Sequence, residues 1–126
     1  MDREIRILVV DDESDYTQPM TLWFKSKGYT IRSVANGEEA LRIIKEDPPD
    51  IVFLDIIMPG MDGYTVLKLV REFNTTIPVV LMSAYEREKK VRRKANFYGV
   101  FGFFNKEEDF SKALSLLHSA LGTNEG

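Results

Sequence analysis

Cysteine is absent from this 126-residue sequence, and so is any long run of apolar residues. Without cysteine there is no disulfide framework, which fits a reducing compartment. No apolar run approaches the roughly 20 residues that cross a membrane, and the charged start of the chain leads directly into a predicted strand rather than a signal peptide. A net charge of −3 argues against general affinity for nucleic acid. We therefore expect a cytoplasmic protein that contacts neither a membrane nor nucleic acid directly.

The composition is that of one folded domain. With 44% hydrophobic and 29% charged residues, the chain can bury a core without disulfides. It contains no repeat, no low-complexity segment and no linker between domains. We expect a single domain over residues 1–126, with a folded core over 5–121 and a flexible tail over 122–126.

Apolar segments of two periodicities alternate along the chain. Short apolar runs predict strands at residues 5–10, 29–34, 51–55, 79–82 and 100–104. Apolar residues at helical spacing predict helices at about 17–27, 38–45, 64–73, 86–96 and 110–121. Pro19 places the start of the first helix near Thr17, because proline is tolerated in a first turn. The alternation predicts an α/β fold with a doubly wound parallel sheet.

One predicted strand ends on a single carboxylate. Residues 51–54 are Ile, Val, Phe and Leu, a run typical of a strand buried on both faces. Asp55 follows at the carboxyl end of this strand, the edge where open α/β sheets bind ligands. Taken alone, Asp55 fits a loop cap as well as a functional site.

The same edge gathers polar residues from three other strands. Asp11 and Asp12 end the first strand, Ser83 ends the fourth, and Lys106 follows the fifth. Three carboxylates in one cleft repel one another, which predicts raised pKa values or a bound divalent cation. With no histidine or cysteine nearby, the oxygen ligands favour Mg²⁺, with Mn²⁺ as an alternative.

Together these side chains predict phosphoryl chemistry. Lys106 offers a point charge to a phosphoryl oxygen, and Ser83 offers a hydroxyl. A carboxylate beside Mg²⁺, a lysine and a hydroxyl can accept a phosphoryl group as an aspartyl phosphate, because such transfer depends mainly on positioning and charge neutralisation. Asp55 is therefore the predicted phosphoacceptor.

On these residues the chain resembles the CheY-like receiver domain of two-component response regulators, over residues 5–121. The segment Val-Val-Asp-Asp-Glu at 9–13 is similar to the acidic pair of the family, and Phe-Leu-Asp-Ile-Ile-Met-Pro-Gly-Met-Asp-Gly at 53–63 to its phosphoacceptor and following turn. Met-Ser-Ala at 82–84 resembles the switch hydroxyl motif, and Lys106 the family's lysine. The resemblance implies a flavodoxin-like (βα)5 three-layer sandwich with strand order 2-1-3-4-5.

The resemblance also implies how the acidic site works. Asp12 and Asp55 ligate Mg²⁺ directly, Asp11 acts largely through water, and the backbone carbonyl of Ile57 completes the protein ligands. A histidine kinase or a phosphotransfer protein donates the phosphoryl group to Asp55. Such a domain is a signalling module that catalyses its own phosphorylation and dephosphorylation rather than an enzyme.

A switch follows phosphorylation in the family that the chain resembles. Ser83 turns toward the phosphoryl group and Phe103 swings inward. The surface of the fourth helix and fifth strand then signals to a downstream protein or output domain, or forms a phosphorylation-linked dimer. Six Lys or Arg residues between Arg87 and Lys94 fall on this fourth helix; they fit either a solvated face or a docking surface for an acidic partner or a like domain.

The sequence departs from the family at three positions. Glu107 follows Lys106, where the family usually has proline, so the geometry of that loop stays open. Ile57 and Tyr85, which flank the site, are apolar and aromatic rather than amide or acid. We expect both to shield the phosphoryl group from water and to lengthen the lifetime of the phosphorylated state.

Three other functions are alternatives to a phosphoacceptor. A phosphohydrolase of the haloacid dehalogenase type needs a second aspartate two residues after the first, where this chain has Ile57. A flavodoxin-like electron carrier needs a phosphate loop rich in Ser, Thr and Gly after the first strand, where this chain has Asp-Asp-Glu. A receiver-like interaction module that is not regulated by phosphorylation stays open as the alternative.

Overall fold

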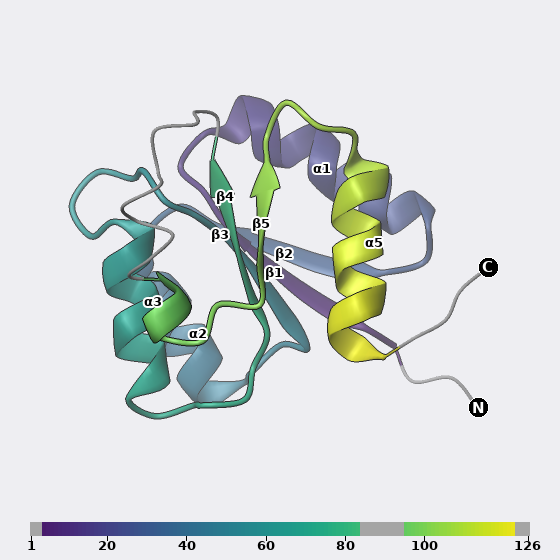
Figure 1. The fold of residues 1–126 in the computed structure, drawn as a ribbon. Helices are drawn as coiled ribbons and strands as arrows, with labels where there is room; N and C mark the ends of the chain where they lie inside the picture. Colours follow the sequence, from purple (N-terminus) through teal and green to yellow (C-terminus); the bar gives the residue numbers. More distant parts are fainter. Residues whose placement is uncertain (1–3, 84–94, 123–126) are drawn as a thin grey trace.

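The computed structural model describes residues 4–83 and 95–122. One parallel sheet has the strand order β2-β1-β3-β4-β5, with helices on both faces (Figure 1). This confirms the predicted α/β fold and its strand order. None of the described helices is long and apolar enough to span a membrane. The strands are β1 (Arg6–Val10), β2 (Thr30–Val34), β3 (Ile51–Asp55), β4 (Val79–Ser83) and β5 (Gly102–Asn105), and the helices are α1 (Ser14–Ser26), α2 (Gly37–Glu46), α3 (Gly63–Arg71) and α5 (Phe110–Leu121).

Alternate side chains of each central strand fill two separate cores. On β3, Val52 and Leu54 pack with residues of α2 and α3, whereas Ile51 and Phe53 pack with residues of α1 and α5. Figure 1 shows these two pairs of helices on opposite sides of the sheet. Because both faces are covered, the central strands β1, β3 and β4 need apolar residues at almost every position, which explains their continuous apolar runs.

The first helix begins earlier than predicted. It starts at Ser14, so Pro19 is its sixth residue and lies beyond the first turn. Proline removes one backbone hydrogen bond, but Asp15, whose carbonyl would have accepted it, is exposed, so water can take the place of the missing donor. Met20 and Phe24 are fully buried on the same helix and offset the loss. The prediction of a start near Thr17 was wrong because it considered the proline without this packing.

The other described elements lie close to their predicted positions. Helix α2 begins after Asn36, whose side chain accepts a hydrogen bond from the backbone N–H of Glu39. Strand β5 begins at Gly102, two residues later than predicted. Most of the predicted fourth helix and its basic residues, at 84–94, lie outside the described residues, as do residues 123–126 of the predicted tail.

Arg71, at the end of α3, fixes the segment that leads into β5. Its guanidinium donates hydrogen bonds to the backbone carbonyls of Tyr98 (2.8 Å), Gly99 (2.9 Å) and Asn74 (3.1 Å). Tyr64, two turns earlier on α3, meets the ring of Tyr98 edge to face, with 5.6 Å between ring centroids. Helix α3 therefore anchors the start of β5, whose other end reaches the carboxyl edge of the sheet.

Gly63, at the start of α3, is packed too tightly for a side chain. A Cβ atom at this position would lie 2.1 Å from the backbone oxygen of Asp55. Gly28, by contrast, has open space around it and a φ of +93°. We predict that Gly63→Ala lowers the free energy of unfolding by about 2–3 kcal/mol through this clash, against about 1 kcal/mol for Gly28→Ala through backbone strain alone. Urea denaturation measures both values, and a smaller loss at Gly63 than at Gly28 would contradict the prediction.

Candidate functional site

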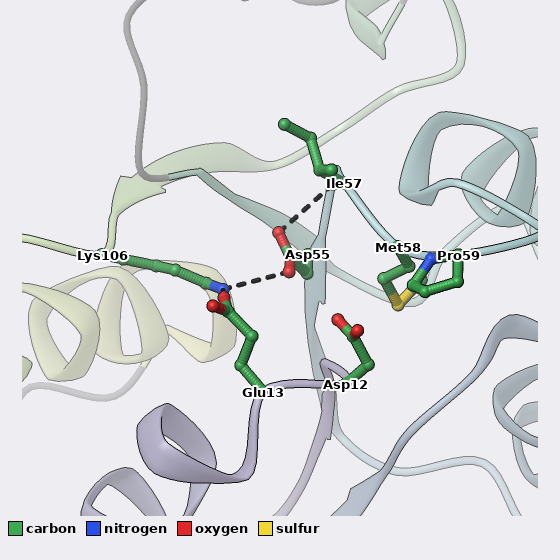
Figure 2. Close-up of a pocket in the computed structure, with 7 residues that line it drawn as sticks. All are labelled: Asp12, Glu13, Asp55, Ile57, Met58, Pro59 and Lys106. Atoms are coloured by element: carbon green, nitrogen blue, oxygen red, sulfur yellow. Dashed lines mark hydrogen bonds and ion pairs between the residues drawn. The ribbon is translucent and has the colours of Figure 1, made fainter.

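A cleft of about 490 Å³ opens at the carboxyl edge of the sheet. Figure 2 shows the carboxylate of Asp55 at its centre, the side chain of Lys106 reaching toward it, and Asp12 and Glu13 projecting from the turn that precedes α1. Among the described residues, its lining consists of Asp12, Glu13, Asp55, Ile57, Met58, Pro59 and Lys106.

A local turn after β1 separates the two adjacent aspartates. The backbone N–H of Asp11 donates to the carbonyl of Val34, which extends the pairing with β2 beyond the end of β1. The Oδ1 atom of Asp11 accepts a hydrogen bond of 3.0 Å from the N–H of Glu13, where the chain turns into α1. As a result, Asp11 is buried while Asp12 is exposed at the cleft.

Asp55 ends β3 with its carboxylate almost fully buried. Only 4% of the residue is exposed, and the backbone N–H of Ile57 approaches its Oδ1 atom at 3.3 Å. Carboxylate oxygens of Asp11, Asp12 and Asp55 all lie within 4.8 Å of one another. The fold thus brings together the three aspartates that the sequence placed at this edge.

Lys106 meets three carboxylates at once. Its Nζ lies 2.7 Å from Asp11 Oδ2, 2.7 Å from Glu13 Oε1 and 3.0 Å from Asp55 Oδ2. Burial by itself lowers the pKa of Lys106, but the contacts with these carboxylates outweigh burial and leave the pKa above its ordinary value. The side chain is therefore an ammonium ion across the physiological pH range.

A turn built on Asn105 positions Lys106. The backbone N–H of Lys106 donates to the carbonyl of Ser83 at 2.8 Å, which extends the pairing of β4 with β5. The side-chain oxygen of Asn105 accepts a 2.8 Å hydrogen bond from the N–H of Glu107, and Glu108 Oε1 accepts one of 3.1 Å from the N–H of Asn105. No described peptide bond is cis, so the bond between Lys106 and Glu107 is trans.

The predicted switch residues lie on neighbouring strands. Ser83 is the half-buried last residue of β4, opposite Asn105 of β5. Phe103 of β5 is half-buried against the core that lies between the sheet and helices α2 and α3. Ile57 lies at the rim of the cleft with 55% of its surface exposed, and Tyr85 lies outside the described residues.

The donor set of the cleft fits a hard divalent cation. Asp11, Asp12, Glu13 and Asp55 bring four carboxylates, of which Lys106 compensates one charge. Asp11, Asp12 and Asp55, the group in the described part of the chain that could hold a metal ion, offer only oxygen donors, with neither histidine nor cysteine. Carboxylate oxygens with space for water favour Mg²⁺ or Mn²⁺ over zinc.

Two neighbours of Lys106 have no role that the sequence predicts. Glu13 lies 93 residues away in the sequence, yet its carboxylate pairs with the lysine. The ring of Tyr16 lies with its centroid 5.0 Å from Nζ of Lys106. No local pattern signals either contact, because both arise when α1 and the end of β5 meet at one edge of the sheet.

Asp55 has an unusual affinity for a proton. Burial, followed by the charge of Asp11, raises its pKa to about 7 against the opposing effect of Lys106. Because this folded-state pKa lies above the ordinary value of 3.8, the folded protein binds the proton more tightly than the unfolded chain does. This contribution to stability is complete below about pH 4 and is lost as the pH rises to about 7.

We therefore predict that Asp55→Asn gains stability relative to the native protein as the pH rises from 4 to 7, in the absence of divalent cations. The difference in the free energy of unfolding should grow by at most about 1.4 kcal/mol per pH unit and level off above pH 7. Urea denaturation at a series of pH values in EDTA measures it. Asp47→Asn, at an exposed carboxylate paired with Arg6, is the matched control; a difference for Asp55→Asn that does not change with pH would contradict the prediction.

Comparisons with known proteins agree on one family. The model of the response regulator receiver domain matches residues 7–118. Regulatory protein AtoC of Escherichia coli is 35% identical over 116 residues, which cover 92% of this chain and 25% of AtoC. Sporulation initiation phosphotransferase F of Bacillus subtilis is 39% identical over 80 residues, 64% of each protein. The chain thus spans less than two thirds of the length of these relatives.

Solved structures lead to the same family. A two-component response regulator from Clostridium difficile is 27% identical with a TM-score of 0.86, over 94% of this chain and 97% of that one. The receiver domain of NtrX from Brucella abortus is 28% identical with a TM-score of 0.84, over 94% of this chain and 99% of that one. With its parallel sheet, its acidic cleft and a family match over residues 7–118, the chain belongs to the receiver domains of two-component response regulators.

Proposed function

We propose that this chain accepts a phosphoryl group on Asp55 from the phosphohistidine of a histidine kinase or a phosphotransfer protein, in a Mg²⁺-dependent reaction in the cytoplasm. The observation that carries the proposal is a buried carboxylate at the centre of a cleft, 3.0 Å from an ammonium and clustered with two further aspartates. Over residues 1–126 we treat the chain as one receiver domain that promotes its own phosphorylation and dephosphorylation.

The transfer requires little covalent chemistry from the protein. A carboxylate oxygen of Asp55 attacks phosphorus, the bond from phosphorus to the imidazole nitrogen of the donor breaks, and the electron pair returns to the ring. Lys106 and the hydroxyl of Ser83 bind phosphoryl oxygens and hold the group in line for attack. Asp55 has to be ionised to attack, and this requirement is met once a cation offsets the charge of Asp11 and Asp12.

The metal site uses the acidic cluster and one backbone group. Asp12 and Asp55 would hold Mg²⁺ directly, Asp11 would act through water, and the backbone carbonyl of Ile57 would complete the protein ligands. When bound, Mg²⁺ neutralises the negative charge that gathers where the phosphoryl group meets the carboxylates. Mn²⁺ suits the same oxygen donors.

Phosphorylation adds negative charge to the cleft. This charge changes the conformation of a surface of the protein. An aspartyl phosphate draws Lys106 and Ser83 toward it, and Phe103 moves inward as Ser83 leaves its position. This shifts an existing equilibrium at the fourth helix and fifth strand. The changed surface acts on a downstream protein, on an output domain or on a second copy of the chain, with no direct contact to nucleic acid or membrane.

The first test is phosphorylation by a small molecule. We predict that the native chain gains one phosphoryl group when incubated with Mg²⁺ and acetyl phosphate, that Asp55→Asn gains none, and that Lys106→Met reacts about 100-fold more slowly because a positioned cation is lost. Intact-mass measurement follows the product.

Asp47→Asn serves as the control for removing an exposed carboxylate and should react like the native chain. If the native chain gains no phosphoryl mass while it binds Mg²⁺ and remains folded, the proposal fails and the unphosphorylated interaction module replaces it. Equal labelling of Asp55→Asn would also exclude Asp55 as the acceptor.

The second test concerns the lifetime of the phosphorylated state. Ile57 at the rim, and with it Tyr85, is expected to keep water away from the phosphoryl group. We predict that Ile57→Asn speeds loss of the group by roughly three- to tenfold, because an amide can orient an attacking water and isoleucine cannot. Time-resolved intact mass after removal of acetyl phosphate measures the rate.

Leu22→Asn is the matched control, since Leu22 is equally apolar and 69% exposed but lies on α1 outside the cleft lining. It should leave the lifetime unchanged. A native half-life of only seconds at neutral pH, or an Ile57→Asn variant that decays at the native rate, would show that Ile57 does not shield the site.

A further inference from the structure

The contacts of Lys106 fall into two classes. Three are carboxylates, from Asp11, Glu13 and Asp55. Within residues 4–83 and 95–122, the other is the aromatic ring of Tyr16, the third residue of α1, whose centroid lies 5.0 Å from Nζ. An ammonium at this distance from a tyrosine ring is attracted by the negative potential of the ring face.

The carboxylates cannot hold the lysine throughout the proposed reaction. In the proposed function Asp55 would hold the cation and is also the group that reacts, and Asp11 would turn to a water of that cation. Glu13 is exposed, with 62% of its side chain accessible, so its ion pair with Lys106 is weakened by water and salt. The ring of Tyr16 has no such competing role.

The ring itself is held firmly. Phe110, the first residue of α5, meets Tyr16 edge to face with 5.8 Å between ring centroids, and the ring of Trp23 lies 5.9 Å from that of Phe110. The hydroxyl of Tyr16 is buried and has no hydrogen-bond partner within residues 4–83 and 95–122. The hydroxyl therefore contributes little to holding the side chain, and the contact with Lys106 is made by the ring.

We propose that Tyr16 is a positioning residue, whose ring keeps the ammonium of Lys106 in the cleft while its carboxylate partners exchange it for a cation and a phosphoryl group. The proposal rests on the proposed function, in which Lys106 binds a phosphoryl oxygen. It assigns Tyr16 no contact with the reacting atoms. The ammonium of Lys106 is attracted by the negative potential of the ring face. The strength of this contact therefore depends on the electron density of the ring rather than on the size of the ring.

The contact between the ring of Tyr16 and Lys106 can be measured without a metal ion or a phosphoryl donor. The ε-methylene signals of Lys106, assigned by NMR with Lys106→Met, should show the upfield shift of protons near an aromatic face in the native protein and in Tyr16→Phe. In Tyr16→Leu this shift should disappear. Native signals at random-coil positions, or signals that are the same in Tyr16→Leu, would overturn the proposal.

The effect of this contact on the reaction is measured as the rate of phosphorylation by acetyl phosphate at saturating Mg²⁺. Tyr16→Leu should react about three- to thirtyfold more slowly than the native chain, the range of a desolvated cation–π contact, and Tyr16→Phe should recover most of the rate. In a Lys106→Met background Tyr16→Leu should have no further effect, because the group that it positions is gone. Additive losses in the double variant would mean that Tyr16 acts through the fold rather than through Lys106.

A shape-preserving substitution keeps the test independent of folding. Replacing Tyr16 by pentafluorophenylalanine keeps an aromatic ring of similar size but reverses the potential of its face. The rate should fall as for Tyr16→Leu, while the melting temperature stays near that of Tyr16→Phe; an unchanged rate would overturn the proposal. If the native chain takes up no phosphoryl group, the proposed function fails, and the NMR shift alone decides whether the ring holds Lys106.

Discussion

One ammonium ion holds the acidic edge of this protein together. Asp11, Glu13 and Asp55 all lie within 3.0 Å of Nζ of Lys106, and Asp12 lines the same cleft without that contact. One positive charge cannot balance four carboxylates, and burial together with the charge of Asp11 raises the pKa of Asp55 against the opposing effect of Lys106. The edge thus takes up a proton more readily than an ordinary aspartate does, and a cation bound there would compete with that proton.

The sheet explains why the charges meet at this edge. Both faces of β1, β3 and β4 are covered by helices, so almost every strand residue is apolar and buried. Polar side chains can enter the structure only where strands end, and in a parallel sheet the carboxyl ends lie together. The close approach of Gly63 to the carbonyl of Asp55 brings the following loop back against this edge. Packing therefore leaves the polar side chains of β1, β3 and β4 mainly at the ends of these strands.

A feature of this structure can be predicted from the sequence when its signal lies within one segment, and not when it depends on contacts between segments. Apolar runs and helical spacing identify the strands and helices because each pattern lies within one segment, and the parallel topology then places Asp11, Asp55 and Lys106 at one edge. The start of α1 was mispredicted because burial of Met20 and Phe24, a tertiary effect, overrides the local signal of a proline. The ring of Tyr16 beside Lys106 has no local signal at all, since it depends on where α1 lies relative to the end of β5.

The loop after Lys106 shows how a departure from the family pattern can preserve the position of the lysine. Glu107 stands where the family usually has proline, and its backbone N–H donates to the side chain of Asn105, a hydrogen bond that proline cannot make. The same turn is closed from the other side by Glu108, which accepts from the N–H of Asn105. Together with the bond from Lys106 N–H to the carbonyl of Ser83, these contacts fix the backbone on both sides of the lysine. Hydrogen bonds thus supply here the rigidity that a proline ring would otherwise give, and Lys106 is presented to Asp55 at 3.0 Å without it.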